Sequence, residues 1–148
     1  MGLIDAIPGR RVYLDANVFI YVFEEFPGFE RELKALFQRF DRRELEGVTS
    51  ELTLGEILVR PFLRNSLEKA KACQSAIVDS DSVQAIPVSR GILVEAARLG
   101  ARAGLRLPDA IHLAATLQER CDVFLTNDKQ PSRVVEIPVV LLSESAHP

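Results

Sequence analysis

The stretch VFLTNDK, residues 123–129, places an acid close behind an apolar run. Its first three residues predict a short buried strand, and Asp128 follows in the polar segment after it. The same pattern occurs near the N-terminus, where VYLDANVF (residues 12–19) leads from three apolar residues directly into Asp15. Parallel strands of an α/β sheet end at one edge, where such proteins bind ligands. The two stretches therefore predict two carboxylates at the same edge of a sheet.

The rest of the chain alternates between strand and helix patterns. We expect strands at residues 11–15, 47–50, 83–88, 122–126 and 137–142, and helices at residues 17–25, 29–42, 51–60, 66–79, 90–103 and 108–119. Pro61 is expected to end the third helix, and Pro108 to take the first position of the last one. This alternation predicts an α/β domain with a mainly parallel sheet.

Length and composition exclude several classes of protein. The 148 residues, 47% apolar and 26% charged, indicate one globular domain, which we assign to residues 1–148 with its core at about 11–142. A net charge of −3 gives no general attraction for nucleic acid, so binding of that kind needs a local basic patch. The sequence shows no signal peptide and no membrane-spanning run, and its two cysteines are isolated. We therefore expect a cytoplasmic protein without membrane attachment.

Two further acids occupy positions that are unusual for a solvated side chain. Glu56 shares a helical face with Leu52 and Val59, although an ion pair with Arg60 would also explain it. Asp109 begins a nearly all-apolar helix, a position that the helix dipole also favours. Both acids are expected at the same edge of the sheet as the two that follow strands.

Asp15 and Asp128 have structural alternatives too, as a helix N-cap and a turn residue. Four carboxylates in one pocket would raise one another's pKa values unless a cation is present, and an all-oxygen site suits Mg²⁺ or Mn²⁺. Such an ion supports phosphodiester hydrolysis, which is our hypothesis. His112, three residues after Asp109, is a possible metal ligand, but on a buried helix we expect it to be a hydrogen-bonded core residue.

Four segments of the chain resemble the signature blocks of the PIN-domain family. They are VYLDANVFIY (12–21), TSELTLGEILVRP (49–61), LRLPDAIHLAATL (105–117) and DVFLTNDK (122–129). The likeness spans residues 11–142 in the family's order. Within the family, the blocks look most like those of the VapC-type ribonucleases, the toxins of toxin–antitoxin pairs. It implies a three-layer α/β/α sandwich with a mainly parallel central sheet. Ala16 stands where many members carry Thr or Ser, a departure that we do not expect to disable the site.

The resemblance also implies a set of site residues and partners. It places the catalytic and metal-binding acids on Asp15, Glu56, Asp109 and Asp128, with Asn17 and Thr126 as supporting polar residues. The implied activity is that of a Mg²⁺- or Mn²⁺-dependent endoribonuclease acting on single-stranded or structured RNA. The implied partners are a cognate antitoxin protein and a second copy of the chain in a homodimer. The antitoxin is expected to lay an amphipathic helix along a groove near helices 17–25 and 29–42.

RNA binding would need cations near these acids. The candidates are Arg98, Arg102, Arg106 and Lys129. The first two lie one turn apart on helix 90–103, and the other two flank the helix and the strand that carry acids. For Arg98 and Arg102 a solvated helix face is an equal alternative.

Other functions also fit an acidic α/β domain. One is a non-catalytic RNA-binding or assembly module on a PIN scaffold. Another is a Mg²⁺-binding phosphoacceptor domain, which is disfavoured because that class needs an acidic pair after the first strand, where this chain has only Asp15. A haloacid-dehalogenase-type phosphatase would need D-x-D, and Asn17 replaces the second Asp.

Overall fold

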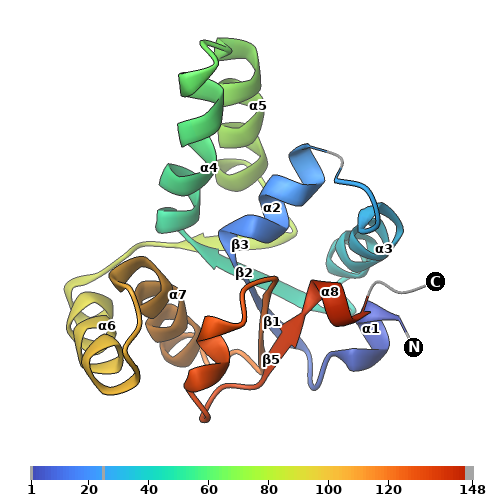
Figure 1. The fold of residues 1–148 in the computed structure, drawn as a ribbon. Coiled ribbons are helices and arrows are strands. Elements are labelled where there is room, and N and C mark those ends of the chain that lie inside the picture. Colours follow the sequence, from blue (N-terminus) through green and yellow to red (C-terminus); the bar gives the residue numbers. More distant parts are fainter. Residues whose placement is uncertain (1, 25, 146–148) are drawn as a thin grey trace.

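The computed structural model describes residues 2–24 and 26–145, except for the side chains of residues 144 and 145. Its centre is a sheet of five parallel strands in the order β3-β2-β1-β4-β5 (Figure 1). The strands are β1 (Arg11–Leu14), β2 (Glu46–Ser50), β3 (Val83–Ile86), β4 (Val123–Thr126) and β5 (Val139–Leu141). The predicted α/β class with a mainly parallel sheet is confirmed.

Helices cover both faces of the sheet (Figure 1). One face carries α1 (Leu3–Ala6), α2 (Ala16–Phe23), α3 (Glu30–Asp41), α4 (Glu51–Leu63), α5 (Leu67–Val78) and α8 (Leu142–Ser145). The other face carries α6 (Arg90–Ala103) and α7 (Leu107–Gln118), while the short 3-10 helix η1 (Gln130–Arg133) joins β4 to β5. The chain therefore forms the expected three-layer sandwich.

The central strand β1 shows how the sequence builds two cores at once. Successive side chains of a strand point to opposite faces of the sheet. Val12 and Leu14 accordingly pack with α2 and α3 in one core, while Tyr13 packs with α6 and α7 in the other. A parallel sheet covered on both faces needs apolar residues at nearly every strand position, which explains the continuous apolar runs in the sequence.

The two prolines behave differently from the prediction. Helix α4 continues through Pro61 to Leu63, so the expectation that Pro61 ends this helix is wrong. A proline removes its own N–H donor but leaves the other bonds of the turn, and Pro61 is buried where α4 packs against α5. Pro108 takes the second position of α7 and not the first, because the helix begins at Leu107.

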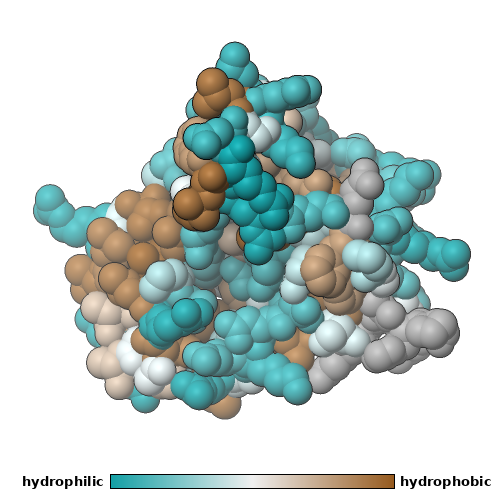
Figure 2. Space-filling view, turned by 45° about the horizontal axis from the view of Figure 1, so that its top comes forward, coloured by the Kyte–Doolittle hydropathy of each residue, from teal (hydrophilic) through white to brown (hydrophobic). Residues whose placement is uncertain are grey.

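Apolar side chains also reach the surface of the described chain. One group lies at the end of the α4–α5 hairpin (Val59, Phe62, Leu63 and Leu67), and another lies on α6 and the start of α7 (Leu93, Val94 and Leu107). Figure 2 shows apolar surface over these helices beside strongly hydrophilic regions. No helix within the described residues is long and apolar enough to cross a membrane.

Candidate functional site

Asp15 lies at the carboxyl edge of the sheet, after β1 and at the N-cap of α2. Its backbone N–H donates to the carbonyl of Leu125, which joins it to the end of β4. The buried carboxylate accepts hydrogen bonds from the Ala16 N–H at 2.8 Å, the Thr126 hydroxyl at 2.6 Å and the Asn17 amide at 3.2 Å. Asp15 is thus both the N-cap residue of α2, which we considered as a structural alternative, and a candidate site residue.

The charge of Asp15 is poorly compensated by its surroundings. Burial raises the pKa of this carboxyl above its usual value, and nearby Glu56 adds to the rise. The charge of His112 and the hydrogen bonds from Thr126 and Ala16 oppose this effect without cancelling it. A bound cation would therefore stabilise the ionised form of Asp15.

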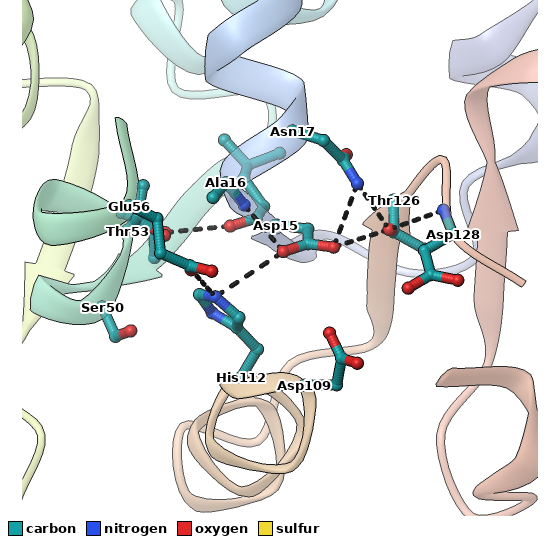
Figure 3. A network of polar contacts seen from close by, with 12 residues as sticks. Asp15, Ala16, Asn17, Ser50, Thr53, Glu56, Asp109, His112, Thr126 and Asp128 are labelled. Atoms are coloured by element: carbon teal, nitrogen blue, oxygen red, sulfur yellow. Dashed lines mark hydrogen bonds and ion pairs between the residues drawn. The ribbon is translucent and has the colours of Figure 1, made fainter. Parts of the chain in front are cut away.

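Glu56 lies on α4 and contacts His112 of α7. Its Oε1 is 2.5 Å from the His112 Nε2, and the same nitrogen is 3.6 Å from the Asp15 Oδ1 (Figure 3). Burial lowers the pKa of His112, but the hydrogen bond to Glu56 and the charges of the surrounding acids outweigh it, so this pKa lies above its usual value. Arg60 pairs with Glu24 at the C-cap of α2, and the alternative of a Glu56–Arg60 ion pair is not realised.

Asp109 and Asp128 lie on the other side of Asp15. Asp109 is in the first turn of α7, and its carboxylate forms an ion pair with the Arg106 Nε at 3.3 Å. Asp128 follows β4, and its carboxylate accepts the Gln130 N–H at 3.0 Å. In Figure 3 the carboxylates of Asp15, Asp109 and Asp128 border one shared space, with Glu56 and His112 beside it. The fold therefore brings all four predicted acids to one edge of the sheet.

The donor set fits a hard divalent cation, but the side chains are not gathered as ligands. Among the described residues, no group of three or more His, Cys, Asp and Glu side chains is placed to hold a metal ion. Asp109 is engaged by Arg106, whose side chain is 75% exposed, and ion pairs with such a solvated partner contribute little. Carboxylate oxygens are nevertheless the ligands that Mg²⁺ and Mn²⁺ prefer. Metal binding by Asp109 would require its carboxylate to separate from Arg106.

Tyr13 and Ser50, which the sequence analysis did not single out, also belong to this network. The Tyr13 hydroxyl lies within hydrogen-bonding distance of the Ser50 Oγ, at 3.0 Å, and of the His112 Nδ1, at 2.8 Å. Tyr13 is fully buried, so its position in an apolar strand indicated only a core residue. A buried tyrosine hydroxyl needs a polar partner, and this requirement is the signal that could have identified it.

The basic candidates Arg98, Arg102, Arg106 and Lys129 differ in their surroundings. Arg102 binds both carboxylate oxygens of Glu136, at 3.1 and 2.7 Å, and Arg98 binds Glu95 at 2.6 Å. Arg106 and Lys129 lie directly beside the site, in contact with Asp109 and next to Asp128 respectively. An RNA-binding role remains a prediction for all four.

The fold and the site together place this chain in the class of parallel α/β sandwiches that carry an acidic site beyond the carboxyl edge of the sheet, here at β1 and β4. The sequence profile of the PIN domain matches residues 12–137. The chain belongs to the PIN-domain family, as its four sequence blocks indicated.

Solved structures with the same fold include toxin–antitoxin complexes. A DNA-bound VapBC from Salmonella typhimurium matches with a TM-score of 0.69 and 16% identity, over 90% of this chain and 99% of that one. A toxin–antitoxin complex from Klebsiella pneumoniae matches with a TM-score of 0.64 and 23% identity, over 88% and 97%. VapC20 from Mycobacterium tuberculosis, described as a Sarcin-Ricin loop cleaving toxin, matches with a TM-score of 0.63 and 16% identity, over 76% and 86%. No curated protein sequence is significantly similar to the chain.

Proposed function

We propose that the chain is a metal-dependent endoribonuclease and the toxin of a toxin–antitoxin pair. The observation that carries this proposal is the meeting of Asp15, Glu56, Asp109 and Asp128, from four separate segments, at one edge of a PIN-domain sheet. The similar solved structures support it, since they are toxin–antitoxin complexes and a toxin that cleaves the Sarcin-Ricin loop.

The four acids would hold Mg²⁺ or Mn²⁺, in keeping with the general use of divalent metal ions by PIN nucleases. When bound, such an ion polarises the phosphodiester and lowers the pKa of water. The chain's own contribution is to fix the orientation of Asp15. Thr126 and Asn17 both donate to its Oδ2, while the Ala16 N–H donates to its Oδ1.

RNA would approach this acidic edge through local cations, because the net charge of −3 gives no attraction at a distance. Arg106, which pairs with Asp109, and Lys129, which follows Asp128 in the chain, would contact phosphates beside the acids. Arg98 and Arg102 would form an outer contact, in which phosphates replace Glu95 and Glu136 as their partners.

The antitoxin would dock in a groove of about 820 Å³ between α2 and the α4–α5 hairpin. Apolar side chains that include Ile20, Phe23 and Ile57 line it, and it reaches Glu56 at the acidic site. Helix α3 contributes no residue to this lining, so the groove adjoins only the first of the two expected helices, and a position beside residues 29–42 stays a prediction. We assign the groove to the apolar face of a partner helix, and we expect the assembly to contain two copies of the chain.

The decisive test is cleavage of RNA by the purified protein. Asp15→Asn, Glu56→Gln and Asp109→Asn should each reduce Mg²⁺- or Mn²⁺-dependent cleavage by at least about 100-fold, because each removes a charge from the proposed metal site. Asp79→Asn, at the exposed C-terminal end of α5, is the matched control and should cleave normally. Equal cleavage by the wild type and Asp15→Asn would contradict the proposal.

The same assay separates the enzyme from a non-catalytic RNA-binding module. A module of that kind would bind RNA in EDTA and leave it intact when Mg²⁺ is added. A phosphoacceptor domain would instead form an acyl phosphate with a small phosphodonor and would leave RNA uncut.

A further inference from the structure

We propose that His112 is a positioning residue that holds Glu56 at the acidic edge, with Tyr13 and Ser50 fixing the orientation of its ring. This inference rests on the proposed metal-dependent function of the site. His112 would act through Glu56 and would not itself contact a metal ion or RNA.

Glu56 needs such a partner because its side chain is more exposed than those of Asp15 and Asp109. Its side chain is 36% exposed, whereas that of Asp109 is 12% exposed and that of Asp15 is 11% exposed. Within the part of the chain that the structure describes, His112 is the one hydrogen-bond partner of the Glu56 carboxylate. A long glutamate side chain without a partner would sample several rotamers and lose its place at the site.

The His112 ring is itself held on both sides. It is almost completely buried, and its Nδ1 lies 2.8 Å from the Tyr13 hydroxyl, while its Nε2 faces Glu56. Tyr13 is stacked on Phe124, with ring centroids 5.5 Å apart and an interplanar angle of 12°. The phenol therefore has little freedom to move, and neither does the imidazole that it contacts.

Hydrogen-bond accounting places a proton on the His112 Nε2. A tyrosine hydroxyl has an ordinary pKa of about 10, so near neutral pH Tyr13 carries a single proton that it can donate to one partner. If Tyr13 donates that proton to His112, the neutral ring carries its own proton on Nε2. If Tyr13 donates to Ser50, His112 must donate from Nδ1, and a bare Nε2 lone pair would then face the Glu56 carboxylate at 2.5 Å. In the second arrangement Nε2 must therefore be protonated as well, which makes the ring a charged imidazolium. Both arrangements leave an N–H pointing at Glu56, the first on a neutral ring and the second on a charged one.

The same N–H lies 3.6 Å from Asp15, so it separates two carboxylates that would otherwise repel each other. Residues that orient metal-binding side chains in this way commonly change metal affinity by about 10- to 100-fold when they are lost. A histidine that only fills the core would affect stability and leave metal affinity unchanged. Metal affinity therefore distinguishes the two roles.

The test compares His112→Gln with His112→Asn in the full chain. A glutamine amide reaches about as far as Nε2 and can still donate to Glu56, whereas an asparagine amide reaches only about as far as Nδ1. Calorimetric titration with Mn²⁺ should show affinity close to wild type for His112→Gln and a loss of about 10- to 100-fold for His112→Asn. Thermal melts in EDTA show that each variant is folded, and Tyr13→Phe provides a second, milder perturbation of the ring.

A double-mutant cycle tests whether His112 acts through Glu56. In a Glu56→Ala background, His112→Asn should cause no further loss of Mn²⁺ affinity. Unchanged affinity in His112→Asn, or losses that simply add in the double variant, would overturn the inference while leaving the nuclease proposal intact. Failure of the wild type to bind Mn²⁺ and cleave RNA would instead overturn both.

Discussion

At the scale of single residues, one hydroxyl group organises much of the candidate site. Thr126 is the last residue of β4, and its side chain is fully buried. It donates to Asp15 at 2.6 Å and accepts the backbone N–H of Asp128 at 3.0 Å and the side-chain amide of Asn17 at 3.2 Å. Two acids from different strands are thereby tied to the same side chain.

Thr126→Val should destabilise the metal-free protein by about 1–3 kcal/mol, because it leaves buried polar groups of the network without their partner while preserving the shape of the side chain. Thr126→Ser keeps the hydroxyl and should lose much less. Urea denaturation in EDTA measures both changes. A valine variant as stable as the wild type would show that this hydroxyl does not hold the site together.

At the scale of elements, β1 and β4 are joined at both ends. At the carboxyl end the Asp15 N–H donates to Leu125, and at the amino end Asp122 accepts the backbone N–H groups of Arg10 and Arg11 at 2.7 and 2.8 Å. Gly9 precedes this contact with φ of +72°, and a Cβ there would lie 2.4 Å from the Asp122 Cγ. The register of the two strands that lead to Asp15 and Asp128 is thus fixed both at Asp15 and at the opposite end of the strands.

The amino-terminal contact predicts a pH dependence. The N–H groups of Arg11 and then Arg10 lower the pKa of Asp122 below its usual value. A carboxyl whose pKa is depressed by folding stabilises the protein above its unfolded pKa of about 3.9 and loses that effect as the pH falls through the folded value. Wild type should therefore be more stable than Asp122→Asn at about pH 6, and the difference should be smaller at about pH 2. Urea midpoints that differ equally at both pH values would contradict this origin.

At the scale of the whole molecule, the acidic edge should couple stability to divalent ions. Asp109→Asn removes one of the acids and only an exposed ion pair, so the metal-free variant should stay within about 1 kcal/mol of the wild type. Under the proposed function Mg²⁺ would bind the folded protein and not the unfolded chain, so it should raise the wild-type melting temperature by mass action and raise that of Asp109→Asn less. Melts in EDTA and in millimolar Mg²⁺ measure both effects, with Asp79→Asn responding like the wild type. A clearly destabilised Asp109→Asn together with a wild type that ignores Mg²⁺ would count against a shared metal site.

The fold and the four acids could be predicted because both depend on local patterns. Apolar strands that alternate with amphipathic helices specify a covered parallel sheet, and an acid directly after such a strand must lie at the sheet's carboxyl edge. The prediction for Pro61 failed because packing of α4 against α5 outweighs the loss of one helical hydrogen bond. The short helices α1 and α8 were missed because four residues are too few to show a period.

The sequence by itself determined the layers of this protein, its membership of the PIN family and the acids at its sheet edge. Only the tertiary structure decided how those acids are held. The contact of Glu56 with His112 joins residues 56 positions apart, and that of His112 with Tyr13 joins residues 99 apart. Such contacts arise only after α4, α7 and β1 have packed. Neither periodicity nor spacing carries this information, because a side-chain hydrogen bond depends on ångström-scale distances between elements that the chain brings together only when it folds.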